Sequence, residues 1–127
     1  MNIKTRTTLI VAILALCSSC STFRSPQWPP AVDPLHGWNG WDENGVDPSS
    51  RIDKAIKDDY PKYLEQHDRH YYALDTAFYE EEGTGRHAVK VLTQNWDHEV
   101  FYYIFIYDKS NRRTKVMRFF YYHAAYC

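Results

Sequence analysis

Residues 100–107 constrain the fold more than any other part of the chain, because each of them is apolar or aromatic. Successive side chains of a β-strand point to opposite faces of the sheet. One face of this strand would carry Val100, Tyr102, Ile104 and Ile106, and the other would carry Phe101, Tyr103, Phe105 and Tyr107. Burying such side chains stabilises a fold by about 1.5–3 kcal/mol each. The segment therefore predicts a strand that is covered on both faces.

Three further segments have the features of strands, namely residues 72–78, 86–94 and 114–123. Short segments rich in glycine or polar residues separate the four strands, at residues 81–85, 95–98 and 108–113. Such segments favour tight turns. Consecutive strands joined by short turns form an antiparallel meander.

A helix is expected before the strands, because apolar residues recur there at helical spacing. These residues are Ile52, Ala55, Ile56, Tyr63, Leu64 and Tyr71. Asp47 followed by Pro48 is typical of a helix start, and Pro61 predicts a kink or a break. The predicted fold class for residues 47–127 is α+β, with one N-terminal helix packed on a four-stranded antiparallel β-meander.

The helix can cover only one face of the sheet, and we expect it to cover the aliphatic face of residues 100–107. Three covers are open for the aromatic face: residues 28–46, a second protomer or a ligand. Prolines and glycines oppose regular structure in residues 21–50. A solvated tether nevertheless has little use for Trp28, Trp38 and Trp41. Residues 20–46 are therefore expected to form a tether followed by a Trp- and Pro-rich covering segment.

The N-terminus predicts export from the cytosol. Lys4 and Arg6 precede an unbroken apolar run at residues 9–16, and small residues follow the run. This pattern is typical of a secretory signal peptide. A membrane-spanning helix needs about 20 apolar residues, and this run is much shorter. Residues 1–19 are therefore predicted to be a signal peptide.

The sequence Cys17-Ser18-Ser19-Cys20 after this run resembles the cleavage site of bacterial lipoproteins. The resemblance implies that a signal peptidase cuts before a cysteine, which then carries acyl chains. Cys20 fits this role better than Cys17, because the residue before Cys20 is small, although the family prefers Leu at the position that Cys17 occupies. Ser21, which stands where an Asp would imply inner-membrane retention, implies the outer membrane facing the periplasm. The membrane is thus an expected partner through lipid at Cys20.

Composition limits the other partners and the chemistry. Removing residues 1–19 takes away Lys4 and Arg6 but no acid, which changes the net charge from −1 to −3. A chain without strong basicity is not expected to bind nucleic acid. The cysteines lack the spacing of a zinc or redox motif, and Cys127 would remain as a single thiol if Cys20 is acylated. We expect no cofactor and no metal.

Four segments could carry chemistry, but each has a plainer interpretation. His67 and His70 share a helix face, but the glutamate of a zinc helix is missing. Residues 42–47 lack the spacing of a calcium loop. Residues 83–85 lie between strands, whereas a phosphate loop precedes a helix. Residues 80–82 are neighbours, whereas sugar hydrolysis needs two carboxylates held across a cleft.

The leading hypothesis is a non-enzymatic binding module of the cell envelope. Its candidate binding residues are Phe101, Tyr103, Phe105 and Tyr107 of the aromatic face, together with Arg112 and Arg113 of a basic turn. An envelope protein or an acidic wall polymer would complement the basic turn.

Two alternatives are open. One is a small lipoprotein enzyme whose site is assembled in space from His87, His98 or His123 and an acid. The other is a purely structural module, in which residues 28–46 cover the aromatic face.

Overall fold

The computed structural model describes residues 25–40, 52–68 and 70–124. The predicted signal peptide, Cys20, Trp41 and Cys127 lie outside the described residues. The elements are β1 (Asn39–Gly40), α3 (Lys54–His67), β2 (Tyr72–Glu80), β3 (His87–Gln94), β4 (Glu99–Tyr107) and β5 (Arg113–His123). Among these residues no helix combines the length and the apolar character that crossing a membrane requires.

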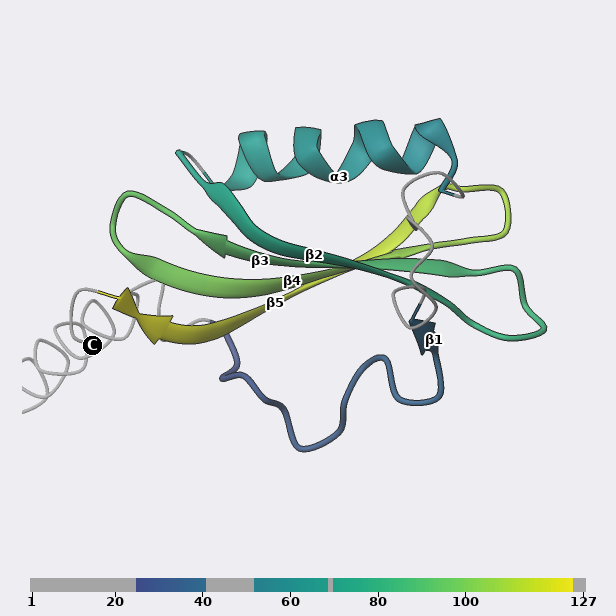
Figure 1. The fold of residues 1–127 in the computed structure, drawn as a ribbon, viewed down its shortest axis with the longest axis horizontal. Helices are drawn as coiled ribbons and strands as arrows, with labels where there is room; N and C mark the ends of the chain where they lie inside the picture. Colours follow the sequence, from purple (N-terminus) through teal and green to yellow (C-terminus); the bar gives the residue numbers. More distant parts are fainter. Residues whose placement is uncertain (1–24, 41–51, 69, 125–127) are drawn as a thin grey trace, which may run out of the picture.

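The five strands form one sheet in the order β1-β2-β3-β4-β5, and each neighbouring pair is antiparallel. This arrangement confirms the predicted α+β class and the meander. The two-residue strand β1, which pairs with the end of β2, adds a fifth strand that was not predicted. Figure 1 shows α3 lying across one face of the sheet and residues 25–40, here called the covering segment, lying across the other.

The helix α3 begins at Lys54, and Asp47, where the helix was predicted to start, lies outside the described residues. Asp53 has extended backbone angles (φ −58°, ψ 144°), and its carboxylate accepts a hydrogen bond of 2.8 Å from the Ala55 N–H. That bond satisfies one of the first-turn amides that a helix leaves unpaired.

Pro61 lies inside α3, and the helix continues through it without a break. A proline inside a helix removes one backbone hydrogen bond and crowds the preceding turn. Ile56 before Pro61 and Leu64 after it are both 1% exposed against the sheet. Their burial holds both halves of α3 on the sheet and outweighs the loss of one hydrogen bond.

The two faces of β4 have the covers opposite to those predicted. Phe101, Tyr103, Phe105 and Tyr107 form a buried cluster with residues of α3 and of β2 and β3. Tyr60 and Tyr63 of α3 contact Phe105 at ring-centroid distances of 6.0 and 5.5 Å. Large rings fit between the sheet and α3, because α3 carries tyrosines that contact them in tilted and edge-to-face arrangements. We call this side the helix face.

The covering segment packs on the aliphatic side, which we call the segment face. Leu35, Ala88, Ile104, Ile106 and Phe119 form its buried cluster, and Trp28 and Trp38 pack against them. An extended segment without helical turns can lie close to a face of smaller side chains. The tryptophan-bearing residues therefore cover the sheet, as expected, but on the face assigned to the helix.

Candidate functional site

A pocket of about 380 Å³ opens on the segment face. Its lining residues come from the covering segment and from the ends of β3, β4 and β5. They are Pro34, Trp38, Arg86, Ile106, Thr114, Lys115 and Met117. Ile106 and Met117 supply an apolar floor, Trp38 an indole, and Arg86 and Lys115 two positive charges.

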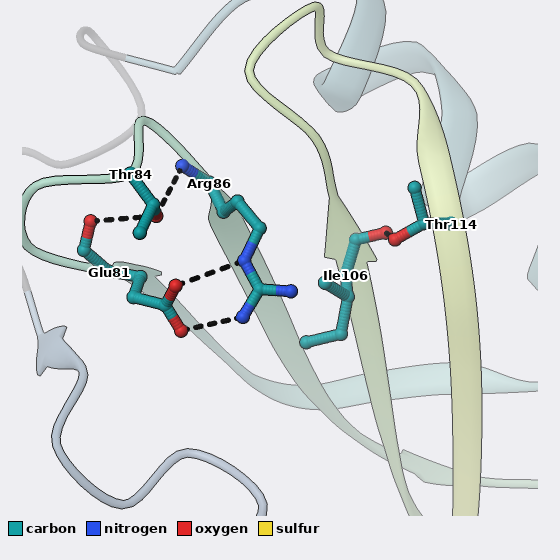
Figure 2. A network of polar contacts seen from close by, with 5 residues as sticks. All are labelled: Glu81, Thr84, Arg86, Ile106 and Thr114. Carbon is teal, nitrogen blue, oxygen red and sulfur yellow. Dashed lines mark hydrogen bonds and ion pairs between the residues drawn. The ribbon is translucent and has the colours of Figure 1, made fainter.

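Arg86, which directly precedes β3, is held in place by a network of polar contacts (Figure 2). Its Nε and Nη2 donate to the two carboxylate oxygens of Glu81, at 3.1 and 2.6 Å. Its backbone N–H donates to the Thr84 hydroxyl, which in turn donates to the Glu81 carbonyl. The hydrogen bond from Arg86 lowers the pKa of the Glu81 carboxyl below its usual range. The guanidinium is thus fixed in a bidentate geometry, which is the more directional form of ion pair.

The same guanidinium faces the pocket over an aromatic ring. Arg86 Cζ lies 5.1 Å from the centroid of the Trp38 ring, within the range of a cation–π contact. Trp38 belongs to the covering segment and closes a turn within it, in which the Trp38 backbone N–H donates to the Leu35 carbonyl at 3.0 Å. Arg86 and Trp38 therefore form a preformed part of the pocket lining, in which Glu81 holds the arginine in place.

Lys115 is the second cation that lines the pocket. It pairs with Ile106 in the β4–β5 register, and its side chain is exposed. Among the residues that the structure describes, Lys115 makes no ion pair. Next to it, the Thr114 hydroxyl donates to the Ile106 carbonyl at 3.3 Å (Figure 2). Lys115 is therefore a cation that a ligand can reach, close to an apolar floor.

The four predicted aromatic site residues lie beneath α3. Phe101 and Tyr103 are each 2% exposed, and Phe105 and Tyr107 are fully buried. A partner could touch these rings only after α3 had left the sheet. They therefore form part of the core, and their predicted role as binding residues for a partner is not compatible with this burial.

The predicted basic residues contact different neighbours: Arg112 ends the β4–β5 turn, and Arg113 begins β5. Arg112 forms an ion pair of 3.5 Å with Asp108 within the turn. The Cζ atom of Arg113 lies 4.6 Å from the centroid of the Tyr63 ring. Its Nη1 atom lies 3.4 Å from Oδ2 of Asp59, with which it forms an ion pair. Arg113 thus holds the turn against α3, while Arg112 stays at the surface.

A buried polar cluster, missed by the sequence analysis, lies where α3 ends on the helix face. Asp68 is 7% exposed and accepts hydrogen bonds of 3.3–3.4 Å from Thr93, Asn95 and Tyr103. Asn95 also donates to Glu99, which is 8% exposed. Burial raises the pKa of the Asp68 carboxyl, because desolvation penalises the charged form, although the three hydrogen bonds partly oppose the shift. This cluster fastens the end of α3 to β3 and β4.

The histidines of the enzymatic alternative separate into two places. His98 and His123 lie close together, with ring centroids 6.4 Å apart, and His123 pairs with Glu99 in the register of the sheet. His87 stands at the other end of β3, opposite Tyr107. None of the three lines the pocket.

Comparisons of the chain with protein-family models, with curated proteins and with solved structures found no match.

Proposed function

We propose that this protein is an exported lipoprotein of the bacterial envelope that binds an anionic ligand without transforming it. The observation that carries the proposal is the pocket, which Arg86 and Lys115 line together with the Trp38 indole and apolar side chains. Pockets that combine apolar walls with a few polar groups are the usual sites for small ligands. Its chemistry fits a carboxylate or phosphate attached to an apolar or sugar-like portion, as in an acidic wall polymer or a side chain of an envelope protein.

The residues of the pocket favour binding over catalysis. Its lining includes two cations and a hydroxyl that already donates to a backbone carbonyl. General base catalysis needs a group that accepts a proton within hydrogen-bond reach of the substrate. The carboxylate nearest the arginine, Glu81, is already paired with it. A site of this composition can hold and orient an anion.

The proposed anchor is the acylated Cys20. The leader ends beside this cysteine, and the described domain begins at Ser25. Two or more acyl chains anchor a protein stably, whereas a single chain gives only reversible binding. The proposed location is the outer membrane, with the domain in the periplasm.

The anchor is tested by labelling growing cells with a radioactive fatty acid. We expect the wild type and Cys17→Ser to be labelled and to sediment with membranes. Cys20→Ser is expected to lose the label and to be recovered in a soluble fraction. Cys17→Ser is the matched control, because the two cysteines stand three positions apart in the same leader. Undiminished labelling of Cys20→Ser would contradict the assignment of the anchor.

The pocket is tested with an anionic aromatic probe, anilinonaphthalene sulfonate, whose fluorescence rises in apolar surroundings. Lys115→Gln is expected to weaken its binding by about tenfold, which corresponds to about 1.4 kcal/mol, the size of one charged hydrogen bond. Inorganic phosphate should compete with the probe. Lys62→Gln, which removes an exposed cation of α3 far from the pocket, should leave the affinity unchanged. Equal losses in both variants would mean that general charge, and not the pocket, attracts the probe.

A further inference from the structure

Exposed apolar side chains gather at one end of the sheet. The described residues include six large hydrophobic side chains that are exposed, and five of them lie at this end. They are Tyr72, Leu74, Trp96, Tyr121 and Tyr122, which we call the aromatic end. Trp96 is 71% exposed and Tyr72 is 50% exposed. Burial of rings is favourable, so a cluster of this kind marks a contact surface.

The topology of the meander brings these residues together. Tyr72 begins β2 and pairs with Gln94 at the end of β3. On the next two strands, Gln94 pairs with Val100 of β4, and Val100 pairs with Tyr122 near the end of β5. Trp96 lies in the β3–β4 turn and stacks on His70, with ring centroids 3.9 Å apart. The tyrosines of β5 contact one another at 4.9 Å. These five side chains stay exposed although α3 and the covering segment lie across the two faces of the sheet (Figure 1).

The chain enters the described domain beside β5, close to the aromatic end. The Ser25 hydroxyl accepts a hydrogen bond of 2.8 Å from Arg118 Nε. Gln27 Nε2 donates to the Tyr121 carbonyl at 2.8 Å. Five residue steps separate Ser25 from Cys20, and an extended chain spans at most about 3.5 Å for each. A lipid on Cys20 would therefore hold Ser25 within about 17 Å of the membrane surface.

We propose that the aromatic end rests in the headgroup region of the membrane that holds the lipid anchor. This inference rests on the anchor proposed above. So short a tether keeps the domain at the bilayer, and the surface that suits a bilayer interface is the one with exposed tryptophan and tyrosine. Such side chains combine an apolar ring with a polar group and are enriched at membrane interfaces.

Charge separates this surface from the basic β4–β5 turn at the opposite end of the sheet. Asp75 and Asp97 are exposed beside the aromatic end, so contact there requires no anionic lipid. The β4–β5 turn, with Lys109 and Arg112, would instead need anionic headgroups. Because the pocket lies next to that turn, a membrane contact through the aromatic end leaves the pocket on the side away from the bilayer, open to ligands of the periplasm.

The test uses the full acylated protein in vesicles of phosphatidylcholine whose acyl chains are brominated near the headgroup, which quenches nearby tryptophan. We expect strong quenching of the wild type and loss of most of the quenchable signal in Trp96→Phe. In a second variant, Trp96→Phe is combined with Lys62→Trp, which places a tryptophan on the exposed side of α3. This reporter should escape quenching. Circular dichroism confirms that the variants are folded, as expected for changes at exposed positions.

Each other outcome has a definite meaning. If the protein takes up the fatty-acid label but Trp96 is not quenched, the membrane contact is overturned and the anchor is not. If the protein takes up no fatty-acid label, both the anchor and the membrane contact are overturned. Quenching that requires phosphatidylglycerol, or that is lost in Lys109→Gln and Arg112→Gln, assigns the contact to the basic turn and overturns the inference. If the protein sediments as a dimer in detergent and Trp96 is shielded from solvent in that dimer, the aromatic end contacts a second copy. That result would also overturn the inference.

Discussion

Replacing Phe105 with Ala is expected to lower the free energy of unfolding by about 3–5 kcal/mol. Phe105 is fully buried between β4 and α3, and its ring contacts Tyr60, Tyr63 and Tyr103. Removing it loses the transfer free energy of the ring and leaves a cavity beneath the helix. Small domains are stable by only about 5–15 kcal/mol, so this change removes a large share of the total. Urea denaturation followed by circular dichroism measures the loss.

Two further variants make this measurement decisive. Val32→Ala truncates a side chain that is 76% exposed and should change the stability by less than about 0.5 kcal/mol. If Phe105→Ala does not fold, Phe105→Leu keeps most of the volume and should remain measurable. A loss below about 1 kcal/mol for Phe105→Ala would contradict the placement of the aromatic face beneath α3.

Replacing Trp28 with Ala is expected to lower the free energy of unfolding by about 2–4 kcal/mol. The reason is that this half-buried indole holds the covering segment on the segment face. Its ring centroid lies 4.5 Å from that of Tyr102 and 5.5 Å from that of Phe119. The Lys90 ammonium lies 4.3 Å from the indole and 4.8 Å from the Tyr102 ring. Trp28→Phe, which keeps a ring in place, should cost less.

The titration of Lys90 separates this effect from general destabilisation. Burial lowers the pKa of the Lys90 ammonium below its ordinary range, against the opposing influence of Asp33 and Asp75. Trp28→Ala would admit water to the ammonium and remove the cause of the shift, so the pKa should rise toward its ordinary value. NMR titration of the lysine side chain measures this change. Phe105→Ala, on the other face, should leave the pKa of Lys90 in place. A Lys90 pKa that does not move in Trp28→Ala would contradict the described cover.

Local patterns in the sequence were enough to place the long strands. The predicted strand at residues 100–107 is β4 (Glu99–Tyr107), and the predicted strand at residues 86–94 is β3 (His87–Gln94). Strand and turn signals extend over only a few residues, so they can be read along the chain. The two-residue β1 has no such signal of its own, because it exists only through its pairing with β2.

The pocket could not be predicted in the same way. Trp38, Arg86 and Lys115 are far apart in the sequence, and none belongs to a recognisable motif. Arg86 follows a turn and precedes a strand, which is compatible with many roles. Its orientation depends on Glu81 across the hairpin and on the indole of the covering segment. The buried carboxyl of Asp68 could not be predicted for the same reason, because its hydrogen-bond partners come from β3, β4 and the residue that follows β3.

The sequence by itself determined that residues 100–107 form a strand with two apolar faces, that both faces need cover, and that a helix and a tryptophan-bearing segment are available as covers. Only the tertiary structure decided which cover lies on which face. Periodicity fixes which side chains share a face, but the choice of partner depends on how rings, methyl groups and backbone fill the space between layers. That packing put the aromatic residues in the core and left the pocket and the aromatic end at the surface.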